Sequence, residues 1–475
     1  MKDFAQILDT PVFRTVGEVA ESLGMECYVV GGYVRDLILE RPSTDIDFVV
    51  VGSGIEVASL CARRLGRHAS VTVFRNFGTA QVRTHGMELE FVGARKESYQ
   101  RNSRKPIVED GTLEDDISRR DFTVNAMAVS VNPSTFGRLV DLYNGAADMQ
   151  SRILRTPLDP DITFSDDPLR MMRAIRFATQ LDFSILPDTF NAIARNASRL
   201  RIVSGERIAV ELRKIMATPR PSTGWKLLLQ SGLLDIILPE LKAMQGVETV
   251  KGRGHKDNFL HTIQVLDNVA AVSDNEWLRW AALLHDIAKP VTKKWDDSTG
   301  WTFHNHNFIG SKMVPRLFKR LKLPLDEKMK YVAKLVELHM RPIALVEDSV
   351  TDSAVRRLLV DAGDDIEDLM TLCRADITSK NPEKVQRHLQ NFEAVKQKMA
   401  DIEARDALRN YQPPVDGHMI MQTFGLTQSP LVGIIKTHIR ESLLNSDTPN
   451  DLTLAMNLMY DKARELGLEP LDKPL

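Results

Sequence analysis

The sequence predicts an α/β (α+β) module with a mixed sheet at the N-terminal side, followed by all-α segments. Residues 27–140 mix short apolar strand signals with helical ones. From about residue 165 onward the apolar positions follow a helical period and strand signals vanish. The chain has 475 residues, of which 43% are apolar, so it is long enough to build about three domains with buried cores.

The expected elements can be placed along the chain in order. Residues 1–24 predict a lead-in helix. Helices are also expected near 33–39 and over 54–65. Residues 95–118 are polar, and a loop of that length inside a compact domain is usually functional or mobile. The strands of the N-terminal module are expected at 27–31, 45–51, 70–75, 79–83 and 88–94.

Breaks in the pattern divide the chain further. Three glycines interrupt the helical region within Gln245–Asn258, and a new helical module begins near His261. Beyond about residue 380 the sequence is helical, charged and low in aromatic residues. We therefore expect four domains, at residues 1–150, 151–245, 256–380 and 381–475.

Composition narrows the class of protein. A net charge of −2 gives no global signal for nucleic-acid binding, so such a surface must be local. Residues 170–220 are the candidate, with ten Arg or Lys against four Asp or Glu. Three dispersed cysteines favour a reducing setting and argue against a thiolate zinc site. Because the sequence also lacks a long apolar run and an N-terminal targeting pattern, we expect a cytoplasmic protein without membrane contact.

The first chemical motif is a glycine pair followed by an acidic pair. Gly31 and Gly32 end an apolar strand, and Arg35 follows them. Asp45 and Asp47 occupy positions i and i+2 of the next strand, where side chains leave the same face. Two carboxylates that point together can share divalent metal, as phosphoryl or nucleotidyl transfer requires. A turn or a solvated strand edge is the alternative for the acidic pair alone, whereas the glycines let backbone amides approach a phosphate.

The second motif, residues 119–126, follows an acidic segment. Its adjacent arginines, Arg119 and Arg120, suit a triphosphate because guanidinium groups make bidentate contacts. Asp121 and Asn125 are one helical turn apart and are candidates for contact with a ribose hydroxyl. The alternative is a charged helix N-terminus, with the aspartate near the positive end of the helix dipole.

The third motif opens the helical region. Arg170, Arg173 and Arg176 recur every three residues and are expected to share one helix face. Asp167 and Arg170 together offer an acceptor and donors, which could read the Watson–Crick edge of a nucleotide base. The alternative is an intrahelical ion pair beside a solvated basic stripe.

Taken in order, these motifs and Asp141-Leu-Tyr-Asn-Gly145 resemble those of class II nucleotidyltransferases, the bacterial tRNA CCA-adding enzymes and poly(A) polymerases. The resemblance covers about residues 25–240. It implies a nucleotidyltransferase head with a mixed sheet, an all-α neck and body, magnesium in the head, and CTP, ATP and the tRNA 3′ end as partners. One departure stands out: the template motif of the family usually begins Glu-Asp, and here it is Asp166-Asp167.

The resemblance also implies roles for individual residues. Asp45 and Asp47 would be catalytic and would hold the magnesium ions. Asp167 and Arg170 would serve as a protein template that pairs with CTP or ATP, and residues 95–118 match the flexible loop of the family. Glu90 is a candidate further acid, with an ordinary strand carboxylate as the alternative. The implied nucleotide-binding residues are Gly31, Gly32, Arg35, Arg119, Arg120, Asp121, Asn125, Asp167, Arg170 and Arg173.

A second chemical cluster lies farther along the chain. His285 and Asp286 stand side by side after an apolar helical stretch, and imidazole with carboxylate suits a divalent metal. The ordered series of histidines and acids resembles the HD metal-dependent phosphohydrolases over about residues 256–380. This implies an all-α HD domain, a divalent transition metal and hydrolysis of phosphomonoesters or cyclic phosphates. The implied metal ligands are His261, His285, Asp286, His306, His339 and Asp376. Asp352 or Asp361 competes with Asp376, and His304 competes with His306.

We therefore expect template-independent addition of C, C and A to the tRNA 3′ end, with a possible second phosphohydrolase activity. One alternative is a poly(A) polymerase, against which the weakly basic tail argues. Another is a split enzyme that adds only CC or only A. An alternative of another class is an HD phosphohydrolase with a nucleotide- or RNA-binding head, against which the intact acidic pair argues. The sequence predicts no oligomeric state.

Overall fold

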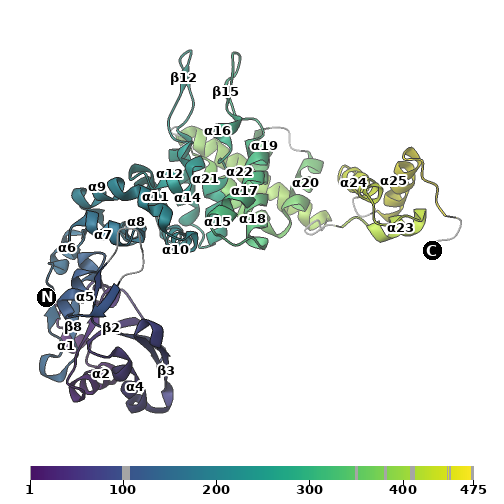
Figure 1. The fold of residues 1–475 in the computed structure, drawn as a ribbon. Coiled ribbons are helices and arrows are strands. Elements are labelled where there is room, and N and C mark those ends of the chain that lie inside the picture. Colours follow the sequence, from purple (N-terminus) through teal and green to yellow (C-terminus); the bar gives the residue numbers. More distant parts are fainter. Residues whose placement is uncertain are drawn as a thin grey trace. The chain divides into compact units, whose positions relative to one another are not determined.

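The computed structural model describes residues 2–98, 107–347, 351–378, 382–406, 412–446, 448 and 451–471. The chain divides into two compact units, Met1–Pro239 and Glu240–Leu475 (Figure 1). The first unit holds a mixed seven-stranded sheet followed by helices, and the second is mostly helical, which confirms the predicted fold class. Across the described residues, no helix has the length and apolar character needed to cross a membrane.

The large sheet has the strand order β3-β4-β5-β2-β1-β8-β9. Within it only β2 and β5 pair in parallel, and every other neighbouring pair is antiparallel. The five strands expected from the sequence are present to within one residue at each end. The strands of the sheet are β1 (Glu26–Val30), β2 (Asp45–Val51), β3 (Ala69–Phe74), β4 (Thr79–Thr84), β5 (Met87–Gly93), β8 (Ala128–Ser130) and β9 (Leu139–Val140).

Aromatic packing holds the centre of this sheet. Phe48 of β2 stacks on Phe91 of β5 with ring centroids 4.8 Å apart, and Phe13 lies 6.0 Å from Phe48. Buried and exposed residues alternate at the start of β2, so its acidic side chains face away from this core. The expected lead-in helix is two helices, because Pro11 begins a second one. The helices of this part are α1 (Phe4–Ile7), α2 (Pro11–Ser22), α3 (Gly32–Ile38) and α4 (Gly54–Leu65).

Residues 95–118 were expected to form one long loop, and that prediction was wrong for the described part. β6 (Arg95–Ser98) and β7 (Ile107–Asp110) pair antiparallel, and α5 (Leu113–Ser118) follows. Thr112 and Asp115 form a capping box that starts α5. A two-stranded ribbon and a capped short helix need few apolar residues, so the polar composition concealed them. Residues 99–106, which belong to the same predicted loop, lie outside the described residues.

The remainder of the first unit is helical, with one exception that the sequence did not predict. β10 (Ile153–Leu154) pairs in parallel with β11 (Ser184–Ile185), and such two-residue strands are too short to leave a pattern. α13 (Pro239–Lys242) spans the division between the units. The helices are α6 (Gly145–Ser151), α7 (Pro160–Asp166), α8 (Leu169–Leu181), α9 (Pro187–Asn196), α10 (Gly205–Met216), α11 (Pro221–Gln230) and α12 (Leu234–Ile237).

The second unit contains helices and two short hairpins. β12 (Thr249–Val250) pairs with β13 (Arg253–Gly254), and β14 (Lys294–Asp296) pairs with β15 (Gly300–Thr302). The two hairpins lie side by side (Figure 1), and they too fall where strand signals were expected to be absent. The main helices are α14 (Asn258–Ala270), α15 (Glu276–Leu284), α16 (Lys289–Thr292), α17 (His306–Arg320), α18 (Glu327–Leu338), α19 (Met340–Glu347), α20 (Asp352–Ala362), α21 (Ile366–Asp376) and α22 (Pro382–Asp406).

The last three helices have an apolar core of their own. They are α23 (Gly417–Phe424), α24 (Pro430–Leu444) and α25 (Leu452–Glu465). Ile420, Ile435 and Met459 are among the fully buried residues of this core. The region is therefore a packed helical segment, as its sequence pattern predicted.

Candidate active sites

The acidic pair lies at the exposed start of β2. Asp45 and Asp47 reach the surface, whereas Ile46 and Phe48 are buried, so both carboxylates leave the same face of the strand. In the parallel pairing with β5, Asp47 lies opposite Glu90. Although the Asp47 side chain reaches the surface, desolvation raises its pKa; the Arg120 guanidinium opposes this rise and the Asp45 carboxylate adds to it.

Glu90 shares the environment of the acidic pair. Desolvation raises the pKa of Glu90, the charge of Asp47 raises it further, and Arg95 opposes the rise. Oxygen ligands of this kind are what magnesium prefers. Asp45 and Asp47, with Glu90 beside Asp47, therefore offer the oxygen atoms that a hard divalent cation takes, and a bound cation would relieve the repulsion that Asp47 feels from Asp45.

The glycine pair sits directly beside the acidic pair. Gly31 has φ 72°, a conformation that favours glycine, and a Cβ there would lie 2.8 Å from Arg120 Nη1 and 3.8 Å from Asp47 Oδ2. Its amide donates to the Met127 carbonyl at 3.3 Å, so this amide is not free for a phosphate. The absence of a side chain at Gly31 therefore lets the side chains of Arg120 and Asp47 lie close to the backbone. Gly32 is the first residue of α3.

Asp116 positions the two adjacent arginines. Its carboxylate is fully buried and pairs with both guanidinium groups: Arg119 Nε lies 3.1 Å from Oδ1, and Arg120 Nη2 lies 3.0 Å from Oδ2. Both arginines remain about one-fifth exposed. The sequence had shown the acidic segment before the arginines but not this role, although the i,i+3 and i,i+4 spacing was a usable signal.

A hydrogen-bonded chain connects α8 to α3 through the second motif. Arg173 Nε lies 2.6 Å from Asp121 Oδ2, Asn125 Nδ2 donates to Asp121 Oδ1 at 3.0 Å, and Arg35 Nη1 donates to Asn125 Oδ1 at 2.9 Å. Arg35 also pairs with Asp36. Burial would raise the pKa of Asp121, but Arg173 and Asn125 outweigh it and lower the pKa to about 2.

This series of hydrogen bonds corrects one prediction about geometry. Asp121 and Asn125 were expected to be neighbours across a helical turn, but α5 ends at Ser118 and only Thr123–Asn125 forms a 3-10 turn. Asp121 lies outside any helix, and its side chain still reaches that of Asn125. Both are at least nine-tenths buried.

The expected base-reading pair lines a shared cavity. Asp167, Arg170 and Arg173 border a cavity of about 260 Å³ together with Arg119, Arg120, Asp121 and Arg207. Asp167 accepts from Arg207 Nη2 at 3.1 Å rather than from Arg170. Arg170 instead donates to the Arg119 carbonyl at 2.6 Å. The intrahelical ion pair, which was the alternative interpretation, is therefore absent between Asp167 and Arg170, and separate partners hold both side chains at the cavity. Arg207 is a residue that the sequence reasoning missed.

The three arginines of α8 do not form one solvated stripe. Arg176 is buried and pairs with Glu211 of α10 at 2.5 Å. Its guanidinium stacks on Phe177, with Cζ 3.9 Å from the ring centroid, and those of Arg35 and Arg173 lie 5.0 and 5.2 Å from the same centroid. Arg176 therefore holds α8 against α10, while Arg170 and Arg173 line the cavity.

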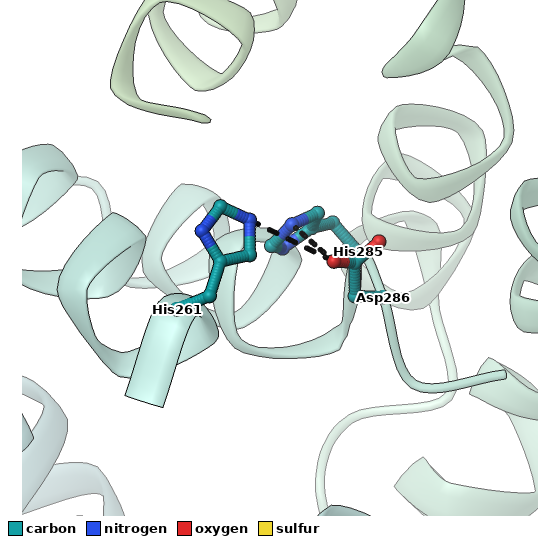
Figure 2. Close-up of side chains that lie close together, drawn as sticks. All are labelled: His261, His285 and Asp286. Carbon is teal, nitrogen blue, oxygen red and sulfur yellow. Dashed lines mark ion pairs between the residues drawn. The ribbon is translucent and has the colours of Figure 1, made fainter. Parts of the chain in front are cut away.

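The second site is the histidine and aspartate cluster of the second unit. Figure 2 shows His261, His285 and Asp286 turned toward one another from α14 and the end of α15. His261 Nε2 lies 3.7 Å and His285 Nε2 lies 3.3 Å from Asp286 Oδ2. On the other oxygen, Oδ1, the Nε2 atoms of His306 and His339 lie at 3.3 and 3.8 Å.

Asp376 completes this cluster. Its Oδ1 lies 2.8 Å from His261 Nε2 and 3.6 Å from His285 Nε2. The two aspartates considered as alternatives to Asp376 form other ion pairs. Asp352 pairs with Lys398, and Asp361 pairs with Arg341 and Arg440. His304 is exposed whereas His306 is buried in the cluster. All six residues expected from the sequence are thus brought together.

Backbone and side-chain acceptors fix the orientation of the four imidazoles. The Nδ1 atoms of His285, His306 and His339 face the carbonyls of Ala282, Phe303 and Val336 at 2.7 to 2.8 Å. The Nδ1 atom of His261 faces Thr378 Oγ1 at 2.9 Å. With Nδ1 engaged, each Nε2 is directed into the cluster, which is the usual arrangement of metal-ligating histidines.

The charges of the cluster also suit a cation. Burial would lower the pKa of His285, but Asp286 and Asp376 outweigh it and raise the pKa to about 10. The pKa of His339 is lowered to about 4 by burial and by His285. His285 Nε2 is buried without a hydrogen bond from the described residues. Two groups of three residues, each with ligand atoms within 4.8 Å of one another, share Asp286, so the donor set fits divalent metal.

Lys289 is a charged neighbour that the sequence reasoning did not assign. Its Nζ lies 2.6 Å from Asp286 Oδ2 and 5.7 Å from the centre of the Phe303 ring. Lys289 stands three residues after Asp286 in the sequence, and this i,i+3 spacing was a usable signal for their contact.

Comparison with known proteins finds related families for both parts of the chain. Three family models match: the poly A polymerase head domain at residues 27–155, the probable RNA and SrmB-binding site of polymerase A at 182–245, and the HD domain at 258–381. The head and the HD domain both belong to metal-dependent families, and the cluster above provides candidate ligands.

Two curated proteins are similar over most of their length. The A-adding tRNA nucleotidyltransferase of Deinococcus radiodurans is 34% identical over 342 residues, which are 70% of this chain and 75% of that protein. The multifunctional CCA protein of Shewanella frigidimarina is 32% identical over 308 residues, which are 63% of this chain and 70% of that protein.

Solved structures show the same fold. A CCA-adding enzyme in apo form II has a TM-score of 0.64 at 22% identity, covering 97% of this chain and 99% of its own. A tRNA nucleotidyltransferase complexed with a primer tRNA and an incoming ATP analog has a TM-score of 0.55 at 25% identity, covering 80% of this chain and 99% of its own. The fold and the head site thus define a nucleotidyltransferase that also carries an HD domain. This chain belongs to the family of tRNA nucleotidyltransferases and poly(A) polymerases.

Proposed function

We propose that the protein adds C, C and A to the 3′ end of tRNA from CTP and ATP without a nucleic-acid template, in the cytoplasm. The observation that carries this proposal is the cavity that joins Asp167 and Arg170 to Arg119 and Arg120 within the unit that bears the acidic pair. A site for reading a base and a site for holding phosphates are thus built from adjacent side chains. The similarity to enzymes named for CCA and A addition supports the choice of tRNA as acceptor.

Each residue has a proposed part in the transfer. The terminal 3′-hydroxyl attacks the α-phosphate, the bond to the pyrophosphate oxygen breaks, and the hydroxyl proton leaves. Asp45 and Asp47 would hold magnesium, which supplies positive charge for the triphosphate and the departing pyrophosphate. Arg119 and Arg120, fixed by Asp116, would contact the triphosphate.

The remaining residues of the head site would select and orient the nucleotide. Asp167 and Arg170 present an acceptor and donors to the base edge, as side chains do when they read bases. Arg173, Asp121 and Asn125 would position the ribose side. Arg35, Gly31 and Gly32 would line the phosphate side, where Gly31 contributes close approach rather than an amide donor.

We also propose functional boundaries for the chain. Residues 1–150 would form the nucleotidyltransferase head and 151–245 the neck and body that hold the acceptor arm through phosphates and A-form shape. Residues 256–380 would form the HD domain. Residues 381–475 would be a helical C-terminal region.

The test uses a tRNA that lacks its last three nucleotides. The full chain is incubated with CTP alone, ATP alone, or both, and the product length is read on a sequencing gel. We expect two additions with CTP alone and three with both nucleotides. A long A tract would identify a poly(A) polymerase instead.

A second candidate is an enzyme that adds only the terminal A. It is favoured by one observation, the 34% identity to an A-adding tRNA nucleotidyltransferase. A tRNA that already ends in CC separates the two. An A-only enzyme extends this tRNA but leaves the tRNA lacking all three nucleotides unextended with any nucleotide mixture.

We further propose that the HD domain hydrolyses phosphate esters or cyclic phosphates at RNA ends. The observation that carries this is the converging set of four histidines and two aspartates. They would hold a divalent transition metal, which supplies a Lewis acid that lowers the pKa of water. For a 2′,3′-cyclic phosphate, a water oxygen adds to phosphorus, one P–O bond to the ribose breaks, and the proton goes to the freed hydroxyl.

The phosphohydrolase proposal has its own test. Wild-type protein with Mn²⁺ should open a 2′,3′-cyclic nucleotide to the monophosphate, detected by chromatography. Asp286→Ala should abolish this reaction while nucleotide incorporation persists. Equal hydrolysis by wild type and Asp286→Ala would refute the assignment of the site.

A further inference from the structure

A cavity that none of the proposed roles uses lies in the second unit. It measures about 390 Å³. It is formed by residues 243–248 before the first hairpin, by the start of α14, and by Pro290 and Lys293 in and just after α16. Its lining includes Met244, Val247, His255, Asn258, Pro290 and Lys293. The lining mixes these apolar residues with polar ones, and Lys293 Nζ pairs with Glu248 Oε1 at 2.8 Å within it. A volume of this order is typical of small-molecule sites.

Hydrogen bonds build the walls of this cavity. Gly246 N donates to Asp257 Oδ2 at 2.9 Å, and Phe259 N donates to the Met244 carbonyl at 3.1 Å. His255 Nδ1 faces the Lys256 carbonyl at 2.6 Å, while its Nε2 accepts from Glu248 N at 3.2 Å. The segment 243–248 is therefore tied to the start of α14, and the cavity is part of the fold rather than a gap between loose loops.

Asn258 is a buried polar residue in the lining of this cavity. Its side chain lines the cavity and is 7% exposed. Within the described part of the chain, no hydrogen bond to its amide group is present. A ligand that pairs with this amide would gain a hydrogen bond worth about 0.5–1.5 kcal/mol. An amide presents a donor and an acceptor side by side, which matches the edge of a nucleobase.

The cavity adjoins the HD cluster through two elements. Asn258 stands three residues before His261 on α14, which places it about 4.5 Å away along the helix axis and on a neighbouring part of the same face. Pro290 follows Lys289, whose Nζ lies 2.6 Å from Asp286 Oδ2. The Phe303 ring lies 5.9 Å from the ring of His255, which lines the cavity, and 5.7 Å from Lys289 Nζ, so the cavity and the cluster share this neighbour. In a nucleotide, only a ribose separates the base from the phosphate.

We infer that this cavity holds the nucleobase of a nucleoside phosphate whose phosphate is hydrolysed at the HD cluster, with the Asn258 amide pairing to the base edge. This inference rests on the proposed phosphohydrolase function. Met244, Val247 and Pro290 would pack against the ring. Asn258 is then a residue that sets specificity, which makes substrates with a base better than substrates without one.

The test compares a nucleotide with a substrate that has no base. Wild type, Asn258→Ala and the control Gln264→Ala, an exposed residue farther along α14, are assayed with Mn²⁺ on adenosine 2′,3′-cyclic phosphate and on bis(p-nitrophenyl) phosphate. We expect Asn258→Ala to raise KM for the nucleotide about tenfold and to leave kcat/KM for the base-free ester unchanged. Gln264→Ala should behave as wild type on both. Equal losses on both substrates, or no loss on the nucleotide, would overturn the inference.

The same assay separates this inference from the function on which it rests. Hydrolysis of the base-free ester without any preference for the nucleotide leaves the phosphohydrolase standing and overturns the base cavity. If neither substrate is hydrolysed, the phosphohydrolase fails, and calorimetric binding of adenosine decides the cavity. Binding that is kept in Arg170→Ala and lost in Asn258→Ala supports it, and any other pattern refutes it.

A final comparison distinguishes an RNA end from a free nucleotide as the substrate whose base occupies the cavity. A short RNA that ends in a 2′,3′-cyclic phosphate is compared with the mononucleotide. A lower KM for the RNA assigns the cavity to the last base of an RNA end, and a lower KM for the mononucleotide assigns it to free nucleotides. In both cases the Asn258→Ala variant should lose the advantage, and an undiminished advantage in that variant contradicts the inference.

Discussion

Replacement of Asp121 by asparagine removes one buried negative charge and keeps the shape of the side chain. Asp121 is 7% exposed, and its Oδ2 lies 2.6 Å from Arg173 Nε. Burial would raise the pKa of its carboxyl, but Arg173 and Asn125 lower it from 3.8 to about 2. A pKa depressed by that amount corresponds to about 2 kcal/mol of folding stability.

The sign of the pH dependence follows from the direction of the shift. A carboxyl whose pKa is lower in the folded state stabilises the protein above its unfolded pKa, here 3.8. That contribution is lost as the pH falls through the folded value of about 2. We therefore expect Asp121→Asn to lower the free energy of unfolding by about 2 kcal/mol at pH 7 and by progressively less below about pH 4.

The assay must report on the first unit alone, because a chain with two compact units does not unfold in one two-state step. Wild type and Asp121→Asn are equilibrated in urea at each pH and then labelled by a pulse of hydrogen exchange at one fixed pH. Peptides from α8 give the fraction unfolded. A difference below about 0.5 kcal/mol at pH 7, or one that persists undiminished at pH 3, would refute the reasoning.

Three further predictions rest on separate contacts. Gly31→Ala places a methyl group 2.8 Å from Arg120 Nη1 at φ 72°, so we expect at least about a tenfold loss of nucleotide incorporation with about 1 kcal/mol of destabilisation in urea melts. Asp116→Asn leaves two partly buried guanidinium groups without their carboxylate; we expect about 3 kcal/mol of lost stability and a raised KM for both CTP and ATP in steady-state assays. Removal of divalent metal with a chelator should lower the melting temperature of the second unit, and His285→Gln should abolish that response in calorimetry.

Much of the fold was accessible from sequence because each element has its own local signal. The strand at 45–51 carries a buried apolar run bounded by polar residues, and Ser53 and Gly54 begin the helix that follows. Boundaries there agree to within one residue. The ribbon at 95–98 and 107–110 was missed because its pairing partner supplies the backbone hydrogen bonds, so its side chains can remain polar.

The candidate sites show a similar division. The candidate site residues could be listed from motif spacing, because Asp45, Asp47 and the histidine series occur in fixed order. Their partners could not all be listed. Arg207 reaches Asp167 from a helix 40 residues away, and Thr378 orients His261 across 117 residues. Such contacts are set by tertiary packing, which leaves no periodic trace in one sequence.

The alternative interpretation of the second motif was wrong. The acidic first turn of a helix belongs to residues 114–116 of α5, where negative charge is favourable. Arg119 and Asp121 instead follow the C-terminal end of this helix, and Asp116 pairs with Arg119 and Arg120 beside the cavity. The position of the motif depends on where α5 ends, and the polar composition of the segment did not reveal that end.

Nucleotide addition to tRNA depends, in our proposal, on the acidic pair of β2. The most direct measurement is single-turnover incorporation of radiolabelled CMP into a tRNA lacking its last three nucleotides, by wild type, Asp47→Ala and the control Glu56→Gln on the surface of α4. We predict incorporation by wild type and Glu56→Gln and none by Asp47→Ala, with the variant still folded by circular dichroism. Incorporation by folded Asp47→Ala at the wild-type rate would contradict the claim.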